Sequence, residues 1–111
     1  MKGRVLIVDD DSTIRGMVRA ILESEGYQVA EAADGLAGVS ALDNEPRPVD
    51  LKLIVLDVVM PGLSGLDVLT RIKLHNDTSS IPVIMLTAES KTEDIMAGYG
   101  VGADYYITKP F

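Results

Sequence analysis

Carboxylates gather at the ends of short apolar runs in this sequence. Asp9, Asp10 and Asp11 directly follow the run VLIV, and Asp57 closes the later run LKLIVLD. Three or four carboxylates held close together repel one another strongly, and a cation between them relieves that repulsion. A hard divalent cation suits these oxygen ligands, because the sequence has no Cys and only one His. We therefore expect Mg²⁺ at this place.

The same residue types suit phosphoryl chemistry. Mg²⁺ keeps several waters and binds through one or two carboxylates plus phosphate oxygens. We therefore expect a phosphoryl group to bind at this site. Asp57 has no second acid beside it and can act as the nucleophile, while Asp9 and Asp10 hold the metal. Thr87 and Lys109, at the ends of two later runs, could contact phosphoryl oxygens. Positioning and charge neutralisation are most of what phosphoryl transfer requires of a protein.

Two hydrophobic periods alternate along the chain and predict the elements that position these residues. Short apolar runs predict buried strands, and apolar stripes with helical spacing predict helices. The predicted strands are residues 5–8, 27–33, 51–57, 81–87 and 105–108, and the predicted helices are residues 14–22, 36–42, 66–72 and 92–99. This alternation favours a parallel sheet with helices on both faces, in which ligands bind beyond the carboxyl ends of the strands.

The starts of two helices can also be read from the sequence. Asp11 precedes the first helix, where the helix macrodipole favours negative charge, and we interpret it as a helix N-terminal residue, not a metal ligand. Ser64 is the expected N-cap of the third helix. In the first helix, Arg15, Arg19 and Glu23 lie outside the apolar stripe, so we expect them on its outer side.

The chain is expected to form one domain. Its 111 residues lie within the usual size range of a single domain. Five predicted strands alternate with only four predicted helices, and a fifth helix after Phe111 would be needed to cover one face of the last strand. We therefore interpret residues 1–111 as a domain truncated at its C-terminus, and we expect some apolar surface to be exposed as a result.

Composition excludes several classes of protein. The net charge is −7 and the basic residues are scattered, whereas binding to a nucleic-acid backbone normally needs clustered Lys and Arg. No apolar stretch approaches the ~18 residues of a membrane span, and the first apolar run is too short for a signal peptide. The absence of Cys fits a reducing compartment. The sequence therefore predicts a cytoplasmic protein with no membrane partner.

Four motifs give the chain a family resemblance. They are VLIVDDD, LIVLDVVMPGLSG, VIMLTA and GADYYITKPF, and together they extend over essentially the whole chain. In this order and spacing they resemble the receiver domain of two-component response regulators. The resemblance implies a flavodoxin-like α/β fold with a doubly wound, five-stranded parallel sheet in the order 2-1-3-4-5.

The resemblance also implies a role for individual residues. Asp57 would accept a phosphoryl group from a histidine kinase in a Mg²⁺-dependent reaction. The metal ligands would be Asp9, Asp10, Asp57 and the backbone carbonyl of Val59. Thr87 and Lys109 would contact the phosphoryl group, and Tyr106 would change rotamer together with Thr87 when the domain switches. Such a domain catalyses its own phosphorylation and dephosphorylation and is otherwise not a conventional enzyme.

The implied partners are a sensor histidine kinase or phosphotransfer protein and an output domain or downstream protein. In this family the fourth helix, fifth strand and fifth helix commonly form a dimerisation or docking face, and the expected loss of the fifth helix puts dimerisation in doubt. Val59 and Glu89 would flank the path of the hydrolytic water, so we expect these two residues to set the lifetime of the phosphoryl group.

Two other functions are compatible with parts of the sequence. Asp9, Asp11 and Thr13 satisfy the D-x-D-x-T nucleophile motif of haloacid-dehalogenase-type phosphohydrolases, with Asp9 as the nucleophile. That family needs a further acidic pair beyond the lysine, and it leaves LDVVMPG unexplained. A receiver fold used only for docking is the other alternative, and the complete set of site residues argues against it.

Overall fold

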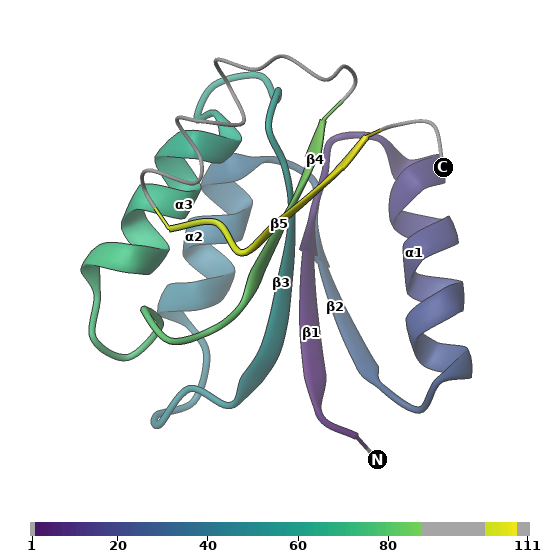
Figure 1. Ribbon diagram of the computed structural model, residues 1–111, viewed down its shortest axis with the longest axis horizontal. Helices are drawn as coiled ribbons and strands as arrows, with labels where there is room; N and C mark the ends of the chain where they lie inside the picture. The colour runs from purple at the N-terminus through teal and green to yellow at the C-terminus, as the bar shows by residue number, and fades with distance from the viewer. Residues whose placement is uncertain (1, 88–101, 109–111) are drawn as a thin grey trace.

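The computed structural model describes residues 2–87 and 102–108. The helix predicted at residues 92–99 and two residues of the predicted site, Glu89 and Lys109, lie outside the described residues. The described elements form a central sheet with helices packed on both of its faces (Figure 1).

Five parallel strands form the sheet in the order β2-β1-β3-β4-β5. They are β1 (Arg4–Val8), β2 (Gln28–Ala32), β3 (Leu51–Asp57), β4 (Val83–Thr87) and β5 (Tyr105–Thr108). The five predicted strands and their predicted order are confirmed. Strand β4 begins two residues later than predicted. Pro82, just before β4, has no N–H to donate to the neighbouring strand. Its carbonyl oxygen accepts a hydrogen bond from Ile54 N of β3 at 3.0 Å.

The register of the sheet brings the predicted site residues to one edge. Val8 pairs with Leu56, so Asp9 follows β1 directly beside the end of β3. Asp57 pairs with Leu86, and the next residue along β4 is Thr87. The carboxyl ends of parallel strands lie at the same edge, and Asp9, Asp57 and Thr87 therefore meet there.

Three helices are described. Helix α1 (Ser12–Ser24) covers one face of the sheet, and α2 (Gly35–Asp43) and α3 (Gly65–Leu74) cover the other (Figure 1). The side chain of Asp11 caps α1 by accepting hydrogen bonds from Thr13 N and Ile14 N. Ser64 and Asp67 form a capping box at the start of α3. Both predicted helix starts are confirmed.

Side chains of β1 alternate between the two layers of the core. Leu6 and Val8 belong to the larger apolar cluster, which includes α2 and α3 residues, and Val5 and Ile7 belong to the smaller cluster beside α1. The α1 side carries a hollow of about 220 Å³ with a purely apolar lining, formed by Val18, Ile21, Leu22, Leu53, Val55, Ile84, Leu86 and Ile107. None of the described helices has the length and apolar character needed to cross a membrane.

Candidate functional site

Three carboxylates meet at the carboxyl edge of the sheet. Asp9, Asp10 and Asp57 each place one oxygen so that all three oxygens lie within 4.8 Å of one another. Asp9 and Asp57 are buried, with 0% and 5% of their surface exposed, and Asp10 is exposed. Sequence reasoning predicted this grouping, and the sheet register explains why it forms.

The backbone around Asp9 is held by several hydrogen bonds. Its N–H donates to Ala32 O on β2 at 3.1 Å, which continues the β1–β2 ladder past the end of β1. Its Oδ1 accepts a hydrogen bond from Asp11 N at 2.9 Å. Its carbonyl oxygen accepts one from Arg15 Nη1 at 2.7 Å. The loop that carries Asp9 and Asp10 is therefore fixed from β2 and from α1.

Asp11 does not share in the cluster because its side chain caps α1. Its Oδ1 lies 2.8 Å from Thr13 N and 3.3 Å from Ile14 N. An N-cap carboxylate satisfies backbone N–H groups that have no partner within the helix. Of the three consecutive acids, Asp9 and Asp10 thus join the group of carboxylates at the sheet edge, and Asp11 caps a helix.

Asp57 is held by the segment that follows it. Its Oδ1 accepts a hydrogen bond from Val59 N at 3.3 Å. Val58 N donates to Leu86 O, and Gly65 N donates to Val58 O, each at 2.9 Å. The chain therefore turns back after β3, and the start of α3 packs on the end of that strand.

Gly65 is a positioning residue that sequence reasoning missed. A Cβ atom there would lie 2.0 Å from the carbonyl oxygen of Asp57, much closer than atoms can approach. Only glycine therefore fits at this position with the backbone as it stands. The available signal was a glycine directly after the Ser64 N-cap, in the motif LDVVMPGLSG.

Thr87 and Tyr106 lie on the neighbouring strands β4 and β5, and Thr87 directly follows the residue that pairs with Asp57. Thr87 is 4% exposed, and its partner across the sheet is Thr108, two residues after Tyr106. Residues two apart on a strand share a face, so Thr87 and Tyr106 point to the same side of the sheet. Tyr106 is partly buried against the larger core cluster, whereas Tyr105 is 66% exposed. Lys109 lies outside the described residues.

The donor set fits a hard divalent cation. The three ligand atoms are all carboxylate oxygens, which Mg²⁺ and similar ions prefer. Two of the carboxylates are buried, and a buried carboxylate is costly unless a cation or hydrogen bonds compensate its charge. The exposed Asp10 leaves one side of the cluster open to water, which Mg²⁺ retains in its shell.

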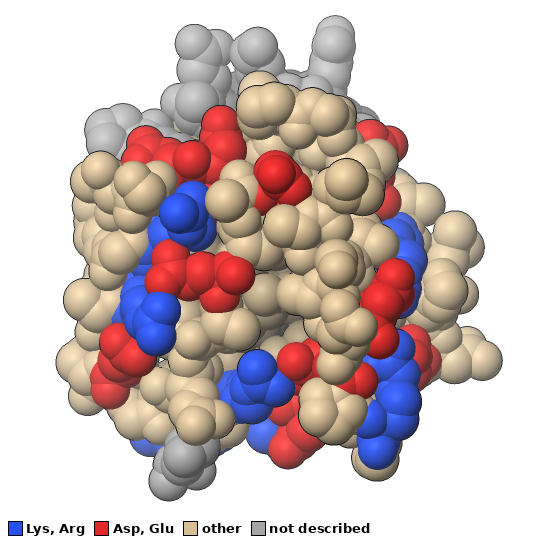
Figure 2. All heavy atoms as spheres, turned by 180° about the vertical axis from the view of Figure 1, so that it is seen from behind, with Lys and Arg blue, Asp and Glu red and all other residues tan. Residues whose placement is uncertain are grey.

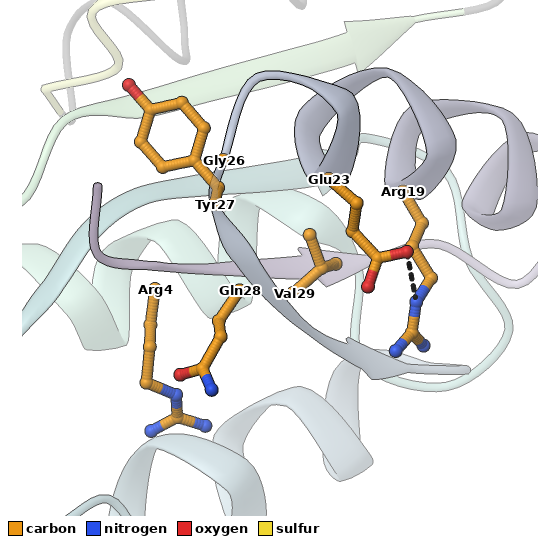
Figure 3. A pocket seen from close by; sticks show the side chains of 7 residues that line it. All are labelled: Arg4, Arg19, Glu23, Gly26, Tyr27, Gln28 and Val29. Atoms are coloured by element: carbon orange, nitrogen blue, oxygen red, sulfur yellow. Dashed lines mark ion pairs between the residues drawn. The ribbon is translucent and has the colours of Figure 1, made fainter. Parts of the chain in front are cut away.

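Charged residues elsewhere are largely engaged with one another. On the face seen in Figure 2, Lys and Arg are interspersed with Asp and Glu and do not gather in one patch. A hollow of about 680 Å³ opens where β1 and β2 begin, lined by Arg4, Arg19, Glu23, Gly26, Tyr27, Gln28 and Val29 (Figure 3). Its two arginines are paired, Arg4 with Glu45 at 2.5 Å and Arg19 with Glu23 at 3.3 Å. The hollow lies at the amino edge of the sheet, away from the acidic cluster of Asp9, Asp10 and Asp57 at the carboxyl edge.

A family model and several relatives match this chain. The model of the response regulator receiver domain matches residues 5–111. The phosphate regulon transcriptional regulatory protein PhoB of Escherichia coli (strain K12) is 46% identical over 111 residues, which are 100% of this chain and 47% of that protein. The DNA-binding response regulator MtrA of Mycobacterium tuberculosis (strain CDC 1551 / Oshkosh) is 39% identical over all of this chain and 46% of its own length.

Solved structures agree with the fold. The chemotaxis response regulator CheY4 of Vibrio cholerae matches with a TM-score of 0.89 and 33% identity, over 100% of this chain and 89% of that one. A Mn²⁺-bound form of the response regulator Rcp1 matches with a TM-score of 0.85 and 30% identity, over 96% and 81% of the two chains. The chain spans about half the length of the curated relatives that it matches.

Proposed function

Because the chain belongs to the response regulator receiver domain family, we propose that Asp57 is the residue that accepts the phosphoryl group. Receiver domains of this family act as phosphorylation-dependent switches in two-component systems. The donor proposed for this domain is a phosphohistidine on a sensor histidine kinase or phosphotransfer protein. The observation that supports the assignment best is the meeting of Asp57 with Asp9 and Asp10 at the carboxyl edge of the sheet.

Asp57 is suited to act as the nucleophile. It ends β3, it is 5% exposed, and the Val59 N–H holds its Oδ1 at 3.3 Å, so its carboxylate has a defined orientation. One oxygen of this carboxylate attacks the phosphorus atom of the phosphohistidine. A new O–P bond forms, the N–P bond breaks, and its electron pair stays on the imidazole nitrogen of the donor. The product is an aspartyl phosphate.

Asp9 and Asp10 are proposed to hold Mg²⁺ together with Asp57 and the backbone carbonyl of Val59. The bound ion would neutralise charge on the phosphoryl oxygens. Receiver domains typically bind Mg²⁺, and the Mn²⁺-bound Rcp1 structure is a relative with a divalent ion. In this chain, Asp9 would be the buried ligand with a fixed backbone, and Asp10 the exposed ligand nearest to solvent.

Thr87, Lys109 and Tyr106 complete the proposed switch. The hydroxyl of Thr87 would donate to a phosphoryl oxygen, and the ammonium of Lys109 would pair with another. Thr87 and Tyr106 point to the same side of the sheet from adjacent strands, so movement of the hydroxyl towards a phosphoryl group would free space for the ring. The two side chains would then bias the domain towards its active arrangement.

The output of the switch is proposed to be an output domain or a separate downstream protein. PhoB is named a transcriptional regulatory protein and MtrA a DNA-binding response regulator, and each is about twice as long as this chain. We propose that this domain makes no nucleic-acid contact of its own and controls the part that does.

Intact-mass spectrometry after incubation with acetyl phosphate and Mg²⁺ tests the proposal. The parent chain should gain the mass of one phosphoryl group, and Asp57→Asn should gain none. Asp11→Asn is the matched control, because asparagine also caps a helix and Asp11 lies outside the metal cluster. It should gain the phosphoryl group as the parent does. An adduct that persists in Asp57→Asn and vanishes in Asp9→Asn would favour the phosphohydrolase mechanism.

A further inference from the structure

Arg15 contacts the acidic cluster through the backbone of Asp9 and not through a carboxylate. It lies in the first turn of α1, and its Nη1 donates to the carbonyl oxygen of Asp9 at 2.7 Å. Its Nε donates to Glu31 Oε1 on β2 at 3.0 Å. Because Arg15 lies outside the apolar stripe of α1, it was expected on the outer side of the helix. Its side chain is nevertheless only 18% exposed. One guanidinium thus joins the metal-site loop to the edge strand of the sheet.

Glu31 is itself held in place by a second arginine. Arg19 Nη1 lies 2.5 Å from Glu31 Oε2, so Arg15 and Arg19 each contact one oxygen of the same carboxylate. The hydrogen bond from Arg19 is the main reason why the pKa of Glu31 lies below its ordinary value, and burial partly opposes that shift. Glu31 is therefore ionised at neutral pH and offers Arg15 a fixed partner.

We propose that Arg15 is a positioning residue that raises the Mg²⁺ affinity of the acidic cluster by fixing the peptide between Asp9 and Asp10. This inference rests on the metal site of the proposed function. A peptide group is planar, so a hydrogen bond to the Asp9 carbonyl also fixes the direction in which the chain enters Asp10. The Asp9 N–H is held by Ala32 O on the other side. Asp10 is the exposed ligand, and its placement depends most on this backbone.

If charge were its only influence, Arg15 would lower the Mg²⁺ affinity of the acidic cluster. A guanidinium close to the carboxylates repels a metal cation, so its removal should strengthen Mg²⁺ binding if charge were its only influence. Loss of the hydrogen bond to Asp9 should weaken binding, because the loop would have to be ordered when the metal binds. The pairing of Arg15 with Glu31 reduces the repulsion and leaves the positioning effect dominant. The two effects therefore differ in sign.

A Mg²⁺ titration followed by ¹⁵N–¹H NMR spectra of the whole chain measures this sign. At constant physiological ionic strength, Arg15→Gln should raise the Kd for Mg²⁺ by about 3- to 10-fold, since a hydrogen bond from a charged donor is lost. Arg15→Lys keeps the charge but cannot reach both partners with a planar fork, and it should raise the Kd by about 2- to 5-fold.

Arg19→Gln is the matched control. It removes the same charge from the same helix and leaves the hydrogen bond from Arg15 to Asp9 in place. Because it loosens only Glu31, it should raise the Kd less than Arg15→Gln does, by no more than about twofold. A Kd for Arg15→Gln equal to or below that of the parent would overturn the proposal. If Arg15→Gln did not fold, Arg15→Lys would decide: parent-like affinity overturns the proposal, and weaker binding supports it.

Failure of the proposed function can be distinguished from failure of the role proposed for Arg15. A parent chain that binds Mg²⁺ but gains no phosphoryl group on Asp57 would contradict the phosphoacceptor assignment, and the comparison of the Arg15 variants would still stand. A parent chain that binds no Mg²⁺ would overturn the positioning role of Arg15 together with the metal site.

Discussion

Gly65 packs directly on the backbone of Asp57. A Cβ atom added to Gly65 would lie 2.0 Å from the carbonyl oxygen of Asp57 and 2.7 Å from the Cα atom of Val58. Both of these neighbours are backbone atoms at the end of a central strand, so they cannot move aside as a flexible side chain would. The start of α3 and the proposed phosphoacceptor therefore hold each other in place.

The contact between Gly65 and Asp57 should influence both stability and phosphorylation. Gly65→Ala should push the start of α3 away from β3, lower the free energy of unfolding by about 1–3 kcal/mol, and slow phosphorylation of Asp57. Because small displacements of reacting groups are costly, the rate should fall on the order of 10- to 100-fold. Chemical denaturation and the rate of adduct formation from acetyl phosphate measure both effects.

Gly16→Ala is the control for that variant. Gly16 lies in α1, and a Cβ atom there would meet nothing within 4 Å. Alanine is favoured over glycine inside a helix, so this variant should be more stable than the parent by up to about 1 kcal/mol and should be phosphorylated at the parental rate. Normal phosphorylation of Gly65→Ala would show that the contact with Asp57 has no influence on the site.

Asp11 should contribute to stability and not to the proposed metal site. Asp11→Ala removes the N-cap of α1 and should lower the free energy of unfolding by about 1 kcal/mol. Asp11→Asn keeps a capping oxygen and should lose much less. Neither variant should abolish Mg²⁺-dependent phosphorylation, because the side chain of Asp11 is engaged with Thr13 N. Loss of phosphorylation in Asp11→Asn would show that Asp11 takes part in the phosphorylation site.

Glu31 should make the stability of the folded chain depend on pH. The hydrogen bond from Arg19 lowers the pKa of Glu31 below its ordinary value of 4.5 in the folded chain. A carboxyl with a lowered folded-state pKa contributes stability above the unfolded pKa and loses it as the pH falls through the folded value. The parent should therefore be more stable than Glu31→Gln at pH 6, and the difference should shrink steadily below pH 4.5.

Urea unfolding of the two proteins at pH 6, 4.5 and 3 measures that difference. Glu25→Gln is a suitable control. Within the described part of the chain, Glu25 makes one ion pair, with Lys2, and this pair is exposed and long at 3.9 Å. A difference between parent and Glu31→Gln that is the same at all three pH values would contradict the assigned coupling.

Val59 should influence the lifetime of the phosphoryl group on Asp57. Val59 lies two residues after Asp57 and is 70% exposed, and its backbone N–H donates to Asp57 Oδ1. An apolar side chain there should hinder the hydrolytic water, whereas an amide can hydrogen-bond it. Val59→Asn should therefore lose its phosphoryl group faster than the parent, and Val59→Leu should match the parent. Equal decay of all three adducts would show that Val59 does not influence hydrolysis.

Much of the site could be predicted from the sequence because it depends on strand ends. Asp9, Asp57 and Thr87 each close an apolar run, and parallel strands deliver such residues to one edge whatever the details of packing. The helix starts at Asp11 and Ser64 could also be predicted from the sequence, because capping is a local interaction. The strand order followed from the family resemblance.

The supporting contacts could not be predicted in this way. Arg15 was expected on the outer side of α1, and its reach to Asp9 and Glu31 depends on how α1 crosses the sheet and on the register of β2. The requirement for glycine at position 65 depends on a loop that folds back over Asp57. Such relations arise from tertiary packing, which hydrophobic periods and local spacing do not describe.

Phosphorylation of Asp57 can be located by peptide mapping after borohydride reduction of the phosphorylated chain. Borohydride converts an aspartyl phosphate to homoserine, so the modified position can be read by tandem mass spectrometry. After incubation with acetyl phosphate and Mg²⁺, homoserine should appear at position 57 and be absent when EDTA replaces Mg²⁺. Homoserine at position 9, or at 57 regardless of EDTA, would contradict the assigned roles of Asp57 and of its two acidic neighbours.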